Sequence, residues 1–425
     1  MTALPLAGVR VLDLTSMLAG VYATRLLADM GAETVKVESL RRYDPTRGAA
    51  IGDTRARVYP GGEPGDRPWN RSSYFNEENR NKLGLTLDLQ RPEGRDLFAR
   101  LVAVSDVVIE NFSAGVMEKL GFGYGVLRDL QPAIVYVSMP AFGNDGPWRD
   151  AVAYGNTVEM LAGMAAVNGY VDGLPTTSGI TYGDPIAGVH AAFAALTALE
   201  HRDRTGEGQY VDLSQLETMI GFLGELALDY SMNGRVRERS GNHDNLAAPH
   251  AVYRCTGADA WVAVSVATDA QWQALCAVLG RADLVHDPRF ALPLDRLDHQ
   301  DELDAIVEGW TVSLTPVEAM TRLQAAGVAA GAVYDAGEFA ADPHVAARGY
   351  LETVAHPDTG PHTHPGLPWR MTGVERAIRA PAPGLGVANV RVLGDLIGVG
   401  GDRLAALEEQ AIIGTIPDAV RDHAT

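Results

Sequence analysis

Cysteine is scarce in this chain of 425 residues. Cys255 and Cys276 are the only two, too few for a disulfide framework or for a zinc site built from thiolates. No apolar run reaches the length of a transmembrane helix. Residues 1–15 carry one arginine and no cleavage site after an apolar core, so we expect no signal peptide. These absences indicate a protein of the reducing cytoplasm.

Positive charge is also in short supply. The formal net charge is −19 at pH 7, and a surface this acidic repels the phosphates of nucleic acids and of anionic membranes. We therefore expect no nucleic acid and no membrane among the partners. An anionic ligand would need local clusters of Lys, Arg or helix N-termini that act against the overall field.

Several familiar catalytic and cofactor motifs are missing. The sequence has no phosphate loop of the Walker type and no Gly-x-Ser-x-Gly elbow. The glycines of 121–125 have the wrong spacing for a dinucleotide fingerprint. His356, His362 and His364 lie among Pro and Gly without a pattern of acidic or cysteine ligands, which favours a surface loop over a metal site. We expect no metal.

The first half of the chain alternates short apolar strands with amphipathic helices, the pattern of a mostly parallel α/β sheet. We predict strands at 9–14, 34–38, 85–89, 106–111 and 134–139, helices at 20–30, 92–104 and 125–130, and a long surface loop at 41–73. A large Rossmann-like domain is the fold class that this pattern favours.

The alternation of strands and helices ends at a polar run rich in Arg, Gly and Asn. We predict a large domain whose N-terminal part spans 1–230, a linker at 231–247 and a smaller α/β domain at 248–340. Residues 341–425 form a return segment and a C-terminal part that completes the large domain, with a further linker at 352–368.

Asp184 stands in the segment YGDPIAG (182–188), where an extended stretch meets a long apolar helix, 185–199. Asp is a preferred N-cap and proline is favoured at the first helical position, so the pattern predicts Asp184 as the cap and Pro185 as the first helical residue. The positive end of the helix dipole would favour the ionised carboxylate that a nucleophile needs. A plain cap without chemistry is the alternative that the local pattern leaves open.

Motifs in order along nearly the whole chain resemble the family III CoA-transferases, the group that includes relatives of formyl-CoA transferase and carnitine CoA-transferase. They are PLAGVRVLDL (5–14), GAETVKVE (31–38), NRNK (79–82), ENF (110–112), GVMEKLG (115–121), GNDGP (143–147), YGDPIAG (182–188), RTGEGQ (204–209), APH (248–250) and YRC (253–255). The resemblance implies an interlocked homodimer, with acyl-CoA and a carboxylic acid as substrates and no tightly bound cofactor.

The resemblance also implies a covalent route. Asp184 attacks the thioester of an acyl-CoA to give an aspartyl anhydride, and the CoA thiolate then attacks the aspartyl carbonyl to give an aspartyl-CoA thioester. The acceptor carboxylate repeats these steps in reverse. Gly183 and the first helical N–H groups are candidates for stabilising the oxyanions. Succinyl-CoA is a candidate donor on the same ground.

Site residues carry over from the family position by position. The resemblance implies CoA contacts at Lys82, Asn111, Phe112, Lys119, Leu120 and Arg42, with Arg41 nearby, and an acyl pocket lined by Met17, Leu18, Tyr154 and Gly155. Ser39 and Val152 replace two basic CoA contacts of formyl-CoA transferase, so we expect those contacts to differ. Leu18 and Gly155 replace polar residues, which favours a larger or more apolar acyl group than formate or oxalate. Glu159 either flanks this pocket or is an exposed helix residue.

Two other functions remain open at this point. The α-methylacyl-CoA racemase branch of the superfamily uses a His/Asp pair for proton exchange, but the strip 153–156 has no histidine, which leaves His190 and His243 as candidates. A non-catalytic acyl-CoA-binding protein is the second alternative. Transfer within one molecule needs the same aspartate and is also open.

Overall fold

The computed structural model describes residues 4–50, 56–374 and 377–423. The chain forms two compact units. The first unit comprises Met1–Met164, Thr177–Arg235 and Gly349–Thr425, and the second comprises Ala165–Thr176 and Val236–Arg348. In the described part of the chain, none of the helices combines the length and the apolar character needed to cross a lipid bilayer.

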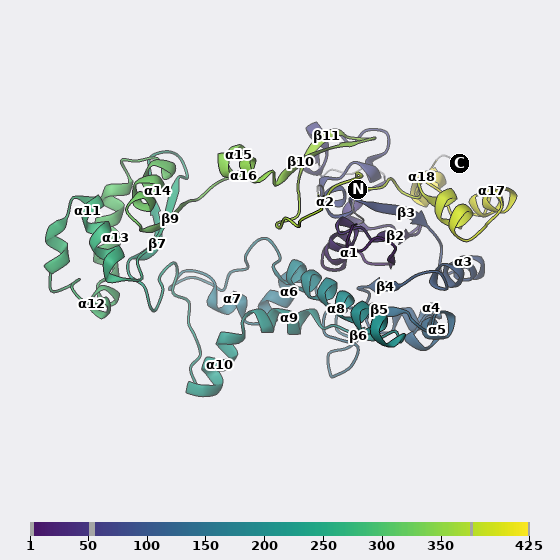
Figure 1. The fold of residues 1–425 in the computed structure, drawn as a ribbon, viewed down its shortest axis with the longest axis horizontal. Helices are drawn as coiled ribbons and strands as arrows, with labels where there is room; N and C mark the ends of the chain where they lie inside the picture. The colour runs from purple at the N-terminus through teal and green to yellow at the C-terminus, as the bar shows by residue number, and fades with distance from the viewer. Residues whose placement is uncertain (1–3, 51–55, 375–376, 424–425) are drawn as a thin grey trace. The chain divides into compact units, whose positions relative to one another are not determined.

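Six parallel strands form the central sheet of the first unit, in the order β3-β2-β1-β4-β5-β6 (Figure 1). They are β1 (Arg10–Asp13), β2 (Glu33–Glu38), β3 (Lys82–Thr86), β4 (Val107–Glu110), β5 (Val135–Ser138) and β6 (Tyr210–Asp212). The order runs in opposite directions on the two sides of the β1–β4 pair, as in doubly wound Rossmann-like folds. The predicted mixed α/β fold is confirmed, although β3 begins three residues earlier than expected.

Helices connect the strands of the first unit and follow the last of them. They are α1 (Ala19–Asp29), α2 (Ser73–Glu78), α3 (Pro92–Val102), α4 (Val116–Leu120), α5 (Tyr124–Leu130), α6 (Gly155–Leu161), α8 (Gly183–Thr205), α9 (Gln215–Phe222), α10 (Gly224–Asn233), the π-helix η6 (Val390–Leu396), α17 (Gly401–Glu409) and α18 (Asp418–His423). The predicted loop at 41–73 contains the short turns η1 (Pro45–Arg47), η2 (Ala56–Val58), η3 (Pro60–Gly62) and η4 (Pro68–Asn70), and its residues 51–55 lie outside the described residues. Helix α7 (Met164–Val167) spans the boundary between the two units.

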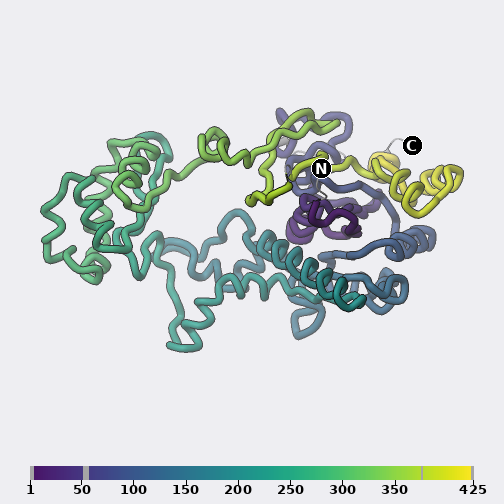
Figure 2. The backbone as a smooth tube through the Cα atoms, in the orientation of Figure 1, coloured from purple at the N-terminus to yellow at the C-terminus, as the bar shows by residue number. Residues whose placement is uncertain are grey.

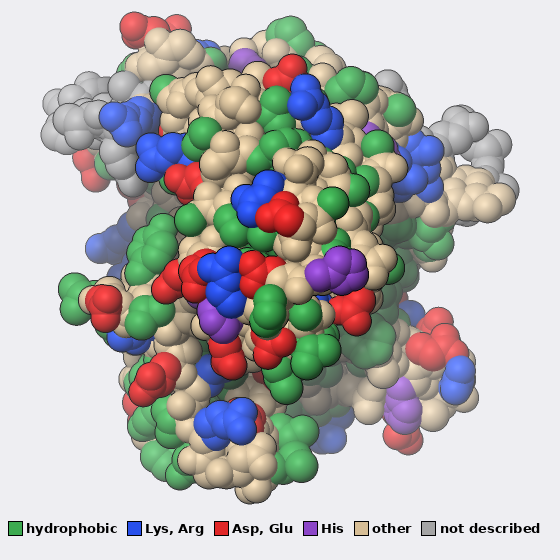
Figure 3. Space-filling view, turned by 90° about the vertical axis from the view of Figure 1, so that its left-hand side faces the viewer, with side chains coloured by type: hydrophobic (Ala, Val, Ile, Leu, Met, Phe, Trp, Pro, Cys, Tyr) green, Lys and Arg blue, Asp and Glu red, His purple; other side chains and the backbone are tan. Residues whose placement is uncertain are grey.

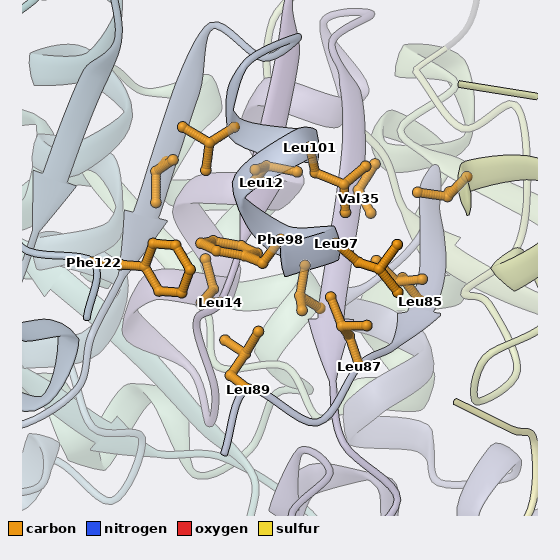
Figure 4. Packing of buried hydrophobic residues seen from close by; sticks show 14 of the residues in the cluster. Leu12, Leu14, Val35, Leu85, Leu87, Leu89, Leu97, Phe98, Leu101 and Phe122 are labelled. Atoms are coloured by element: carbon orange, nitrogen blue, oxygen red, sulfur yellow. The ribbon is translucent and has the colours of Figure 1, made fainter. Parts of the chain in front are cut away.

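Alternate residues of each strand pack on opposite faces of the sheet. Val11 and Val137 pack on the face that α1 and α8 cover. Leu12, their neighbour in sequence, packs on the other face, where α3 contributes Phe98 (Figure 4). Phe98 meets Phe122 edge to face, with ring centroids 4.7 Å apart. The sheet is therefore covered on both faces at β1, β4 and β5, which explains why β4 and β5 are almost continuously apolar.

The C-terminal segment returns to the edge of the sheet at β3 (Figure 2). The amide N–H of Ala388 donates to the carbonyl of Gly84 at 2.9 Å, and the side chain of Asn389 accepts from the amide of Thr86 at 2.9 Å. These bonds satisfy backbone groups that an edge strand would leave open.

A β-hairpin occupies the segment predicted to be a histidine-bearing loop and linker. Strands β10 (Leu351–His356) and β11 (Gly360–Pro365) pair antiparallel, with His356 opposite Gly360 and Val354 opposite His362. Because side chains alternate along a strand, His356, His362 and His364 share one face of this hairpin. The loop prediction was wrong here.

The second unit combines a three-stranded antiparallel sheet with helices. Its elements are β7 (His250–Arg254), β8 (Trp261–Ser265), β9 (Ala329–Ala332), α11 (Asp269–Leu279), the turn η5 (Ala282–His286), α12 (Pro293–Asp298), α13 (Gln300–Thr311), α14 (Pro316–Ala325), α15 (Ala336–Ala341) and α16 (Pro343–Arg348). Trp272 and Phe290 lie in its own hydrophobic core. Thr315 caps α14 and Pro316 begins it, a position at which proline costs no hydrogen bond.

Candidate active site

Helix α8 begins earlier than the sequence indicates. Its first residue is Gly183, so Asp184 is the second helical residue and not the N-cap. Thr181 adopts the left-handed conformation, with φ +50°, and its carbonyl accepts from the amide of Asp184 at 3.1 Å. This turn brings the chain into helical geometry before the Asp-Pro pair, which corrects the predicted cap.

Burial changes the expected acidity of the Asp184 carboxyl group. Desolvation raises its pKa to about 6, a hydrogen bond with the side chain of Thr181 opposes the rise, and the negative charge of Glu159 adds to it. The prediction that the helix dipole would favour the ionised form is therefore incomplete, because burial outweighs it. At pH 7 the carboxylate form still predominates by roughly ten to one.

Glu159 lies under the start of α8. It is fully buried, so it is not the exposed helix residue considered above, and it does not line the cavity around Asp184. Its carboxylate accepts from the amide of Tyr182 at 2.5 Å and from the hydroxyl of Ser178 at 2.9 Å. Glu159 thus satisfies an N–H group at the beginning of α8 and places a negative charge near Asp184.

Gly155, the first residue of α6, faces the Asp184 carboxyl group. A Cβ atom at position 155 would lie 2.4 Å from Oδ2 and 2.8 Å from Cγ of Asp184. Any side chain at this position would therefore displace the carboxylate. This contact brings two of the predicted site residues together.

Asp184 lines a cleft of about 1130 Å³, here called the Asp184 cleft. The four predicted pocket residues all line it, together with segments that the sequence did not single out. The lining residues are Met17, Leu18, Pro45, Thr46, Gly48, Arg57, Val58, Ser72, Ser73, Tyr74, Glu77, Glu78, Tyr154, Gly155, Asn156, Thr181 and Asp184. Met17, like Thr181, has a left-handed backbone, with φ +65°. Such strain in non-glycine residues concentrates at functional sites.

A second cavity of about 560 Å³ lies at the carboxyl ends of β1, β2, β3 and β4, and we call it the strand-end cavity. It includes the point where the strand order reverses, the usual ligand position in open parallel sheets. Arg42, Phe112 and Leu120 line it, as does Arg41. Pro45 lines both this cavity and the Asp184 cleft.

Asn111 holds the loop after β1 in place between the two cavities. Its side-chain oxygen accepts from the amide of Ser16 and its side-chain nitrogen donates to the carbonyl of Ser16, each at 2.9 Å. This loop leads directly into Met17 and Leu18 of the Asp184 cleft. Lys119 is exposed on α4 and lines neither cavity.

The structure gives Lys82 a different role from the predicted CoA contact. Its side chain is buried, and its ammonium donates to Asp13 at 3.0 Å, Thr24 at 2.8 Å and Asn79 at 2.9 Å. Burial lowers its pKa to about 8, against the opposing effect of Asp13. The amine is engaged within the protein, so it stabilises the start of β3 and presents no free charge to a ligand.

No histidine lines the Asp184 cleft within the described part of the chain. His190 is exposed on α8, where its Nδ1 bonds the carbonyl oxygen of Ile186 at 2.8 Å. His243 belongs to the second unit and pairs with Asp304 at 2.6 Å. Neither histidine candidate for proton exchange therefore lines the cleft of Asp184.

Residues 6–389 match the family model described as CoA-transferase family III. The chain belongs to CoA-transferase family III. This confirms the resemblance and makes the protein an enzyme of the family III CoA-transferase type, a group whose members act on CoA thioesters and carboxylic acids.

Individual relatives of this family III enzyme are similar to it over nearly its whole length. It is 35% identical over 409 residues to succinyl-CoA–D-citramalate CoA-transferase of Chloroflexus aurantiacus, covering 96% of this chain and 98% of that protein. It is 34% identical over 393 residues to succinate–glutarate CoA-transferase of Agrobacterium fabrum, covering 92% and 96%. A crystal structure of a CaiB/BaiF family protein from Brucella suis superposes with a TM-score of 0.82 at 30% identity, covering 93% of this chain and 100% of that one.

Proposed function

We propose that this family III enzyme transfers CoA from an acyl-CoA donor, succinyl-CoA or a close analogue, to a carboxylic acid acceptor through Asp184. The observation that carries the proposal is the position of Asp184 at the start of α8, on the wall of a cleft of about 1130 Å³. The names of two relatives, which refer to succinyl-CoA and to succinate, support the choice of donor.

The chemistry proceeds by acyl exchange at one carboxylate. A carboxylate oxygen of Asp184 attacks the thioester carbon, the C–S bond breaks, and CoA leaves as a thiolate. The thiolate attacks the Asp184 carbonyl carbon of the resulting anhydride and expels the donor acid, which leaves an aspartyl-CoA thioester. The acceptor carboxylate then reverses both steps and departs as the new acyl-CoA.

Oxyanions formed in these steps need a donor that the fold does not already use. The amide of Tyr182 is bound by Glu159 and the amide of Asp184 by the carbonyl of Thr181. Among the described residues, the amide of Gly183 has no hydrogen-bond partner, and it lies at the positive end of α8. It is therefore our candidate for the oxyanion donor.

We place the nucleotide end of CoA in the strand-end cavity. Arg41 and Arg42 supply cationic groups there for phosphates, and Phe112 and Leu120 supply apolar surface for the base. Asn111 contributes by holding the loop between the two cavities. From this position the pantetheine arm reaches the Asp184 cleft past Pro45, which lines both cavities.

The Asp184→Asn variant tests the proposal. We expect it to fold normally but to lose transfer by at least about 10³-fold, because the amide is no nucleophile. Wild-type enzyme incubated with succinyl-CoA and then hydroxylamine should carry a hydroxamate at Asp184 in peptide mass spectrometry, and the variant should carry none.

Asp150→Asn is the matched control, because the Asp150 side chain is 88% exposed and lines neither cavity. Near-normal turnover in Asp184→Asn would remove the proposal. An unmodified Asp184 with bound acyl-CoA would instead favour a binding protein, and deuterium exchange at the α-carbon without an adduct would favour a racemase.

We further propose an interlocked homodimer, as the family resemblance implies. Helix α8 exposes Val189, Phe193 and Leu196, whose spacing of four and three residues places them on one side of the helix. Phe193 is 69% exposed. An apolar stripe of this kind on a helix is typical of a surface that a second chain covers.

A further inference from the structure

We propose that Arg57 binds the distal carboxylate of a dicarboxylic acyl group and so makes the enzyme selective for dicarboxylic acids. This inference rests on the proposed function and names the substrate class of the same site. Arg57 lies in the turn η2 and is the one cationic residue among those that line the Asp184 cleft, within the described part of the chain.

The guanidinium of Arg57 is available to a ligand. Arg57 is exposed, and it has no hydrogen-bond or ion-pair partner among the described residues. Most arginines elsewhere in the unit are engaged: Arg47, for example, is buried and paired with Glu38 at 2.7 Å. A free arginine on the wall of a cleft is a ready partner for a carboxylate, because its planar fork matches both oxygens.

The other charges of the cleft are negative. Besides Asp184, the lining includes Glu77 and Glu78, and both already pair with Arg25, at 2.9 Å and 3.1 Å. Burial raises the pKa of Glu78 above its ordinary value. These carboxylates offer no attraction to a second carboxylate on the acyl group, whereas Arg57 does, and the pairing with Arg57 would set the direction in which the acyl chain lies.

Arg57 is separate from the cations that we assign to CoA. Arg41 and Arg42 line the strand-end cavity and not the Asp184 cleft, whereas Arg57 lines the cleft and not the strand-end cavity. Arg57 also borders a smaller cavity of about 340 Å³ beside the hairpin of β10 and β11. A dicarboxylic acyl-CoA carries negative charge on its CoA phosphates, which would meet Arg41 and Arg42, and on its distal carboxylate, which would meet Arg57. A neutral acyl group has no carboxylate to pair with Arg57.

The test compares two donors of equal chain length, succinyl-CoA and butyryl-CoA, with the matching acids as acceptors. In Arg57→Gln we expect the ratio of kcat/KM for succinyl-CoA to that for butyryl-CoA to fall about 100-fold, the usual effect of losing a charge-assisted pair. Arg57→Lys should recover part of the ratio, because it keeps the charge but loses the fork.

Arg67→Gln is the matched control, since Arg67 lies in the same segment, is 56% exposed and lines none of these cavities. The ratio should stay at the wild-type value in this control. An unchanged ratio in Arg57→Gln would overturn the proposal. If the ratio is unchanged because kcat/KM falls equally with both donors, Arg57 contacts the CoA part instead. A wild-type preference for butyryl-CoA would overturn it as well.

Calorimetry with free succinate and free butyrate separates this proposal from the transfer chemistry. Wild-type enzyme should bind succinate more tightly than butyrate, and Arg57→Gln should bind the two alike. The proposed function fails when no adduct forms at Asp184 with either donor. The assignment of Arg57 fails when the adduct forms but Arg57→Gln changes neither the kcat/KM ratio of the two donors nor the preference for free succinate over free butyrate.

Discussion

At the scale of single residues, Gly155 matters because it has no side chain. The Asp184 carboxyl group occupies the space in which a Cβ at position 155 would lie. We expect Gly155→Ala to lower the rate of adduct formation about 10²-fold, since a nucleophile displaced by about 1 Å loses that much. Single-turnover measurement of the aspartyl adduct checks this.

Gly125→Ala is the control, because a Cβ there, within α5, meets no atom within 4 Å. It should keep full activity and gain about 0.4–1 kcal/mol of unfolding free energy. A folded Gly155→Ala enzyme with wild-type adduct formation would show that the carboxylate does not need this space.

The sequence does not show whether the charge of a basic residue is paired within the protein or free to bind a ligand. Lys82 and Arg57 are both basic, but the ammonium of Lys82 is engaged by Asp13, Thr24 and Asn79, whereas Arg57 has an open guanidinium among the described residues. The family resemblance pointed to Lys82 and not to Arg57. Local pattern cannot distinguish a buried ion pair from a free charge, because Asp13 and Thr24, two of the partners of Lys82, come from distant segments.

At the scale of elements, α6 places the negative charge of Glu159 close to Asp184 at the start of α8. Burial, together with the negative charge of Glu159, raises the pKa of Asp184 to about 6. Only the carboxylate form attacks a thioester, so the rate of adduct formation should be constant well above pH 6 and fall as the pH drops through 6. In Glu159→Gln the pKa of Asp184 should be lower, and the fall should shift to more acidic pH.

Single-turnover rates from pH 5 to pH 8 in both enzymes measure this shift. Glu200→Gln, at the far end of α8 and paired with Arg204 on the surface, should leave the profile unchanged. Coincident profiles for wild type and Glu159→Gln would show that the charge of Glu159 does not reach Asp184.

Regular elements with strong periodicity were predictable, and elements defined by turns were less so. The alternation of strands and helices up to β5 follows from apolar pattern alone, since each strand is buried on both faces. The hairpin of β10 and β11 was missed because its strands contain Pro and polar residues, although Pro357, Asp358 and Gly360 lie where a turn forms. The first turn of α8 was misplaced because Thr181 adopts a backbone conformation that β-branched residues rarely take.

At the scale of the whole molecule, the net charge of −19 requires that anion recognition be local. On the face that Figure 3 shows, acidic side chains lie among Lys and Arg and do not form one patch of a single sign. The cationic groups that we assign to substrate line the two cavities instead: Arg41 and Arg42 in one, Arg57 in the other. An acidic protein can therefore bind a polyanionic donor without a basic surface.

The assembly state gives the last prediction. Light scattering on the wild-type enzyme should give twice the chain mass of 45.3 kDa. We expect Phe193→Asp to lower that mass or to prevent soluble expression, because it places a charge in the apolar stripe of α8. Val126→Asp, at a site on α5 that is 45% exposed, changes a single exposed valine and should remain a dimer.

An interlocked dimer should also exchange its subunits extremely slowly. Two chains that pass through each other cannot separate without unfolding, so differently tagged wild-type dimers mixed at neutral pH should form no mixed dimers over days, and mixed dimers should appear only after denaturation and refolding. Rapid exchange would show an ordinary dimer, and a mass of 45.3 kDa would show that the stripe on α8 has no second chain to cover it.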